Sequence, residues 1–124
     1  MIVYDTGALV AGERGDRRMW ALHEATLRRG ALPVVPAGVL AQAWRGGPQA
    51  NLSRLLQGCD IGPLDEPSAR EAGSLCAAAV TPDVIDANVV VLAARLRAGV
   101  VTSDPSDIER LAQASGIAVA VHGI

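Results

Sequence analysis

Three aspartates that are far apart in the sequence stand where folding can bring polar groups together. Asp5 directly follows the apolar run 2–4, Asp104 comes two residues after the apolar run 100–102, and Asp86 lies in the first turns of a long helical segment. In parallel sheets, ligands bind beyond the carboxyl ends of the strands. We therefore expect the three carboxylates to converge on one rim of the fold.

Carboxylates gathered in one place repel one another unless a proton or a cation neutralises them. A cluster of oxygen ligands without histidine or thiolate suits Mg²⁺ or Mn²⁺. Such an ion would orient a water and stabilise charge on a phosphate, which predicts metal-assisted hydrolysis. His23 and His122 have no partner at ligand spacing, so we interpret both as structural or surface residues.

Each acid also has a purely structural interpretation. Asp104 precedes Pro105, and Asp107 follows three residues later, which is the pattern of a helix cap. Asp86 can be a solvated helix residue, and Asp5 can form an Asx-turn or cap the helix that follows it. Capping and metal binding are compatible, because one carboxylate has two oxygens.

Short apolar runs alternate with segments of helical pattern along the chain. The expected strands are 2–4, 33–35, 59–63, 100–102 and 117–121. The expected helices are 6–12, 16–29, 36–44, 49–57, 66–79, 82–98 and 105–115. This alternation predicts an α/β fold with a parallel sheet covered on both faces. The length, without a repeat or a linker, predicts one domain, 1–124.

Two of these helices have specific start signals. Thr6 is expected to cap the first helix, and Thr81 is expected to cap the helix 82–98 with Pro82 at its first position. Asp83, in the first turn of that helix, is expected to interact favourably with the helix dipole. The apolar residues that recur at helical spacing, and so predict its buried face, are Ile85, Val89, Leu92 and Leu96.

The composition of the 124-residue chain narrows the chemistry further. It has 11 arginines and no lysine, which excludes Schiff-base catalysis and a Walker-type phosphate loop. A net charge of −2 gives no general attraction to nucleic acid or membrane. The chain has no apolar stretch long enough to span a membrane and no basic segment that opens a signal peptide. We therefore expect a cytoplasmic protein, in which Cys59 and Cys76 stay reduced.

Four segments, in this order, resemble PIN-domain nucleases, and most closely the VapC-type ribonuclease toxins of bacterial toxin–antitoxin pairs. They are 2–6 (IVYDT), 35–44 (VPAGVLAQAW), 83–87 (DVIDA) and 102–107 (TSDPSD). Each motif alone is weak, and their order gives the specificity. The resemblance covers essentially the whole chain.

The resemblance implies a three-layer α/β/α sandwich with a mostly parallel central sheet, an acidic Mg²⁺ site, endonucleolytic cleavage of RNA, a homodimer and inhibition by a cognate antitoxin. It implies that Asp5, Asp86 and Asp104 hold the metal, Mg²⁺ or Mn²⁺, and carry the catalysis. Asp107 matches a frequent auxiliary acid of the metal site. Thr6 and Ser103 would be hydrogen-bonding neighbours of the ligands.

Gln42 departs from the family pattern, which usually has glutamate at this position. Glutamine keeps an acceptor oxygen, but it carries no charge and cannot act as a general base. Metal affinity should therefore fall, and a second metal becomes doubtful. The match implies a site residue, whereas the structural alternative is a glutamine that points out from its helix. An impaired domain that binds RNA or an antitoxin without cutting is accordingly the alternative to an active ribonuclease.

A polyanionic substrate beside acidic groups requires basic residues at the border of the site. Residues 25–59 contain no Asp or Glu but four arginines, and three more arginines precede them. Arg14 and Arg45 follow site-bearing segments and are the expected phosphate contacts. The alternative is a solvated surface or a docking patch for an acidic antitoxin. A flavodoxin-like ligand binder is disfavoured, because no G-x-G-x-x-G motif is present.

Overall fold

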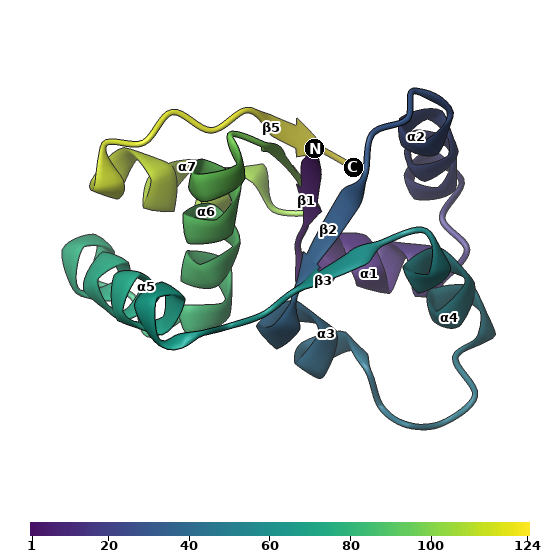
Figure 1. Ribbon diagram of the computed structural model, residues 1–124, viewed down its shortest axis with the longest axis horizontal. Helices are drawn as coiled ribbons and strands as arrows, with labels where there is room; N and C mark the ends of the chain where they lie inside the picture. Colours follow the sequence, from purple (N-terminus) through teal and green to yellow (C-terminus); the bar gives the residue numbers. More distant parts are fainter.

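The central sheet of the computed structural model, which describes all 124 residues, has five strands in the order β3-β2-β1-β4-β5 (Figure 1). The strands are β1 (Ile2–Tyr4), β2 (Pro33–Pro36), β3 (Asp60–Gly62), β4 (Gly99–Thr102) and β5 (Val121–Gly123). Every neighbouring pair is parallel, so all five carboxyl ends lie at one edge of the sheet. The expected parallel sheet is confirmed.

Strand β1 lies at the centre of the sheet, where it pairs with β2 on one side and β4 on the other. Ile2 is in register with Pro33 and with Gly99. Both faces of the sheet are covered, so a central strand needs apolar side chains on both faces. This is why β1 and the middle of β4 are continuous apolar runs with no solvent-exposed member.

The helices form the two outer layers. They are α1 (Thr6–Glu13), α2 (Arg17–Arg28), α3 (Ala37–Ala43), α4 (Ala50–Gln57), α5 (Glu66–Ala79), α6 (Val84–Leu96) and α7 (Pro105–Ser115). Figure 1 shows α5, α6 and α7 on one side of the sheet and α1, α2 and α4 on the other. Helix α3 lies at the carboxyl edge of the sheet and contacts both α1 and α6, so it bridges the two layers.

Helix α6 packs more completely than its sequence pattern predicted. Val89 of the expected stripe is fully buried, but Ile85, Leu92 and Leu96 are only partly buried. The neighbouring stretch 87–91 is buried as well, because α6 is packed between the sheet and both α5 and α7. A helix that is covered on several sides must be apolar around most of its circumference.

Three sequence expectations about element ends are wrong. Asp5, not Thr6, caps α1, since its carboxylate accepts a hydrogen bond from the backbone N–H of Ala8. Asp83, not Thr81, caps α6 in the same way, so that helix runs 84–96. The last strand is 121–123, not 117–121, because the residues between the end of α7 and residue 121 connect that helix to the edge of the sheet.

No single helix is long and apolar enough to span a membrane; α5 and α6 pass that test by length and composition only when joined, across a bend of 114°.

Candidate functional site

Asp5 is a buried carboxylate at the point where β1 becomes α1. It is 5% exposed, and its amide donates to the Val101 carbonyl at 3.1 Å. Its Oδ1 accepts from the Ala8 amide at 2.8 Å, which caps α1 and leaves the other carboxylate oxygen outside the cap. Burial raises the pKa of Asp5, while hydrogen bonds from Thr102 and Ala8 lower it and the charge of Asp104 adds to the rise.

Asp86 lies in the first turn of α6, beside the α6 cap. Its amide donates to Oδ1 of Asp83 at 3.0 Å. Its pKa is raised to about 7, chiefly by burial and then by the negative charges of Asp83, Asp5 and Asp107. The carboxyl groups of four different chain positions therefore act on one another in the folded protein.

Asp104 and Asp107 lie at the start of α7, where Asp104 is the cap and Asp107 is in the first turn. Asp104 Oδ1 accepts from the Ser106 hydroxyl at 2.9 Å and from the Asp107 amide at 3.5 Å, which caps α7. These hydrogen bonds lower the pKa of Asp104. Asp107 is within 3.5 Å of Arg110. Asp104 is exposed and Asp107 is partly exposed, so both carboxylates are reached by solvent.

The acids therefore converge at the start of three helices, and the capping interpretation is confirmed for Asp5 and Asp104. Asp83 belongs to the same cluster, and sequence reasoning assigned it only to the helix dipole. The sequence feature that could have placed Asp83 in the cluster is its position three residues before Asp86. Each of these capping contacts uses Oδ1 of its aspartate.

The chemistry of this donor set suits a hard divalent cation, because it consists of carboxylate oxygens. Burial raises the pKa of both Asp5 and Asp86, and the negative charges of neighbouring aspartates add to the rise. The positions do not yet form a closed coordination shell. No three His, Cys, Asp or Glu side chains are placed to hold one metal ion together. Binding would require the exposed carboxylates of Asp104 and Asp107 to turn toward Asp5 and Asp86.

Gln42 lies at this site and does not simply point away from its helix. The Thr6 hydroxyl donates to Gln42 Oε1 at 2.6 Å, which joins α3 to the first turn of α1 next to Asp5. Gln42 also lines a hollow of about 480 Å³ together with residues 81–85 at the start of α6. The amide therefore stands between the two helix starts that carry Asp5 and Asp86.

The structure separates the two arginines that the sequence grouped as phosphate contacts. Arg45 donates to the carbonyls of Ala41 (3.3 Å) and Trp44 (2.9 Å), so it is engaged at the end of α3. Arg14 is exposed and forms no ion pair. It lines a hollow that also includes Ser103, the residue before Asp104.

The histidines and cysteines lie outside the acidic cluster. His23 is buried, and its Nδ1 shares a hydrogen bond of 2.8 Å with the Tyr4 hydroxyl. Burial lowers the pKa of His23, which fits a neutral structural histidine. His122 is exposed in β5, and both cysteines are free thiols. The donor set of the site is therefore oxygen alone.

Comparisons with known proteins identify the fold. No protein-family model matches the sequence, and no curated protein does. Among solved structures, a chain of VapBC2 from Rickettsia felis bound to a DNA fragment from the promoter superposes with a TM-score of 0.73 and 15% identity, over 100% of this chain and 99% of that one. A chain of FitAB bound to an IR36 DNA fragment gives a TM-score of 0.69 and 18% identity, over 99% and 94%. A chain of FitAcB from Neisseria gonorrhoeae gives the same TM-score and identity, over 99% and 97%.

These matches correct one expectation and confirm another. The assignment to VapC-type toxins is wrong at that level of detail, because the matched chains come from complexes of two different kinds and share at most 18% of their residues with this chain. The fold class is confirmed, since the likeness extends over nearly the full length of each matched chain. The chain has an α/β fold, a PIN-like three-layer sandwich with a parallel central sheet.

Proposed function

We propose that this protein is a metal-dependent endoribonuclease that hydrolyses RNA phosphodiester bonds. The observation that supports the proposal is electrostatic: Asp5 acts on the pKa of Asp86, which is raised to about 7, and Asp104 acts on the pKa of Asp5. A group of carboxylates that repel one another binds a divalent cation favourably, because the cation relieves that repulsion. The PIN-like fold supports the same interpretation.

Asp5, Asp86 and Asp104 would hold Mg²⁺ or Mn²⁺, with Asp107 as an auxiliary acid. When bound, the ion would supply positive charge for the phosphate and activate a water. Asp5 serves as the fixed ligand, because the Ala8 amide and the Val101 carbonyl hold it in place. Asp86 would hold the ion in its ionised form, and Asp104 would do so from its exposed position at the start of α7. Thr6, whose hydroxyl donates to Gln42, and Ser103 would be the polar neighbours of these ligands.

We further propose that the protein is the toxin half of a toxin–antitoxin pair and acts in the cytoplasm as a homodimer. The support is the fold shared with chains of the VapBC2 and FitAB complexes. An antitoxin would then be the cognate partner and RNA the substrate. Co-expression with the product of a neighbouring short gene, followed by size-exclusion chromatography, would test both the partner and the dimer. A monomer that ignores that product would contradict this part of the proposal.

The decisive experiment compares cleavage of structured RNAs by the wild type and by Asp5→Asn, with Mg²⁺, with Mn²⁺ and with EDTA. Asparagine keeps an oxygen that can accept from the Ala8 amide, so the cap survives while the charge is lost. We expect cleavage by the wild type only, abolished by EDTA. Glu109→Gln, an exposed acid of α7 outside the cluster, is the matched control and should cleave normally. Equal Mn²⁺ affinity of the wild type and Asp5→Asn in calorimetry would remove the metal site from the proposal.

The alternative function is a catalytically impaired domain that binds RNA or an antitoxin. The observation that favours it is the short hydrogen bond between Thr6 and Gln42, which places a neutral amide beside the acids. Gln42→Glu keeps the acceptor oxygen and adds a charge. A large gain in cleavage would identify the wild type as impaired. No gain would show that the site tolerates the amide.

A further inference from the structure

A hollow of about 330 Å³ lies beside the acidic cluster, along one face of α1. The first turn of α1 separates the two regions. Asp5 caps that turn, Thr6 faces Gln42, and Gly7 lines the hollow. Ser103, which precedes Asp104, lines it from the loop between β4 and α7. The hollow is therefore next to the residues that precede or follow Asp5 and Asp104 in the sequence.

The shape of the hollow depends on a close approach between α1 and the β4–α7 loop. A Cβ on Gly7 would overlap Ser103 Oγ, so the absence of a side chain at residue 7 lets the hydroxyl stand against α1. Ser103 is exposed, and its hydroxyl stands against α1 at the rim of the hollow. The hydroxyl is thus an available donor at the border between the hollow and the acids.

Arg14 lines the same hollow and forms no ion pair. The two acids nearest to it in the sequence are both engaged with helix starts. Glu13 Oε2 accepts from the Leu52 amide at 3.2 Å in α4, and Asp16 Oδ1 accepts from the Met19 amide at 2.9 Å in α2. Asp16 also lines the hollow, but neither acid pairs with Arg14.

We propose that this hollow is a binding subsite for a backbone phosphate of single-stranded RNA, with Arg14 and Ser103 as the contacting residues. It deepens, and rests on, the proposed ribonuclease function. A guanidinium and a hydroxyl are both donors, which match phosphate oxygens. The subsite would hold a phosphate next to the one at the acids, and so fix the strand in register.

The test is the salt dependence of binding. A short fluorescein-labelled single-stranded RNA of mixed sequence is titrated with the full-length protein in EDTA, at a series of NaCl concentrations, and followed by fluorescence anisotropy. Each phosphate contact with a cation contributes about 0.7 to the slope of log affinity against log salt for single strands. Arg14→Gln should therefore lower the slope by about that amount and weaken binding roughly three- to tenfold at low salt.

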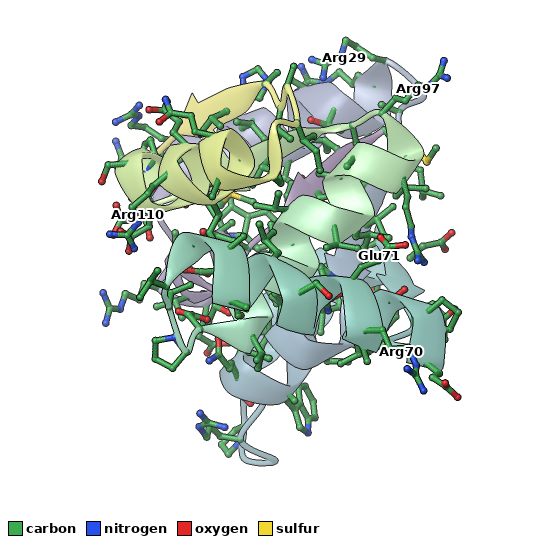
Figure 2. All side chains as sticks on the ribbon, turned by 90° about the vertical axis from the view of Figure 1, so that its left-hand side faces the viewer. Arg29, Arg70, Glu71, Arg97 and Arg110 are labelled. Carbon is green, nitrogen blue, oxygen red and sulfur yellow. The ribbon has the colours of Figure 1, made fainter.

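Two further variants separate a phosphate contact from a general loss of charge. Ser103→Ala should weaken binding without changing the slope, because a hydroxyl releases no counterion. Arg97→Gln is the matched control, since Arg97 is also exposed and without an ion pair. Figure 2 shows Arg97 at the upper edge of the molecule, and it lies two residues before the start of β4, at the opposite end of the sheet from the acids. It should leave both slope and affinity unchanged.

The outcomes distinguish this subsite from the catalytic proposal. An unchanged slope for Arg14→Gln, equal effects of Arg14→Gln and Arg97→Gln, or no RNA binding by the wild type would overturn the subsite. If the wild type cleaves RNA while Arg14→Gln keeps the wild-type slope, the ribonuclease proposal stands and the subsite fails. If the slope changes as expected and the wild type cleaves nothing with any metal, the subsite stands and the ribonuclease proposal fails.

Discussion

Replacing Asp86 by asparagine should make the metal-free protein more stable at alkaline pH. The folded state raises the pKa of Asp86 from its ordinary value of 3.8 to about 7. A carboxyl group whose pKa is higher in the folded state stabilises that state fully at pH values below its unfolded-state pKa. This stabilisation is lost as the pH rises through the folded-state pKa. The wild type therefore loses this contribution between about pH 4 and pH 8. The asparagine side chain does not titrate, so Asp86→Asn escapes the loss.

The size of the effect follows from the displacement of the pKa. A change from 3.8 to about 7 corresponds to about 4 kcal/mol between the two protonation states. Asp86 is only half-buried, and solvent screens the charges around it, so roughly 1–2 kcal/mol should remain in the free energy of unfolding. For a chain of this length, that corresponds to a rise in Tm of about 3–8 °C.

The assay is urea denaturation in EDTA at about pH 8 and about pH 5, followed by far-ultraviolet circular dichroism. We expect Asp86→Asn to exceed the wild type at the higher pH and the gap to narrow at the lower one. Glu109→Gln controls for the loss of any surface charge and should show neither effect. Equal stability at alkaline pH, or a gap that does not change with pH, would refute the electrostatic account of the cluster.

Two further predictions concern the framework that supports the site. Val80 is a β-branched residue that is 90% exposed and has φ 54°, a backbone conformation that glycine adopts without strain. Val80→Gly should therefore raise the free energy of unfolding, measured in urea, by about 0.5–1 kcal/mol. Arg97 has φ 52° but no β-branch, so Arg97→Gly should raise the free energy of unfolding by less. Tyr4→Phe removes the hydroxyl that pairs with buried His23, and should cost about 1–2 kcal/mol by the same measurement. Tyr4→Phe with unchanged stability would show that the bond contributes nothing.

The acidic cluster shows how far local reasoning reaches. Asp5 and Asp104 could be singled out from the sequence because each follows an apolar strand, and parallel strands end at a common edge. From the sequence, Asp83 was expected only to interact favourably with the helix dipole. Its position three residues before Asp86 is typical of a helix cap and does not by itself indicate an acidic cluster. Its effect on the pKa of Asp86 depends on how deeply that carboxyl is buried, and no local pattern contains this information.

Gln42 and Arg45 illustrate the same limit from the side of polar contacts. Thr6 and Gln42 are 36 positions apart, and only the packing of α3 across the sheet edge brings the hydroxyl and the amide together. Arg45 stands in a run of positive charge, but its guanidinium is engaged by carbonyls at the end of its own helix. Sequence spacing predicted neither contact, because hydrogen-bond partners are chosen by distance in space.

The sequence by itself determined the alternation of short apolar strands and helices, and hence the parallel sheet with its acids at one edge. These features follow from hydrophobic periodicity, which is a property of neighbouring residues. The tertiary structure decided which acids share a charge environment, which arginine is engaged by backbone carbonyls, and where the last strand pairs. Burial, electrostatic coupling and edge pairing depend on atoms that are close in space and distant along the chain, so they exist only once the layers have packed.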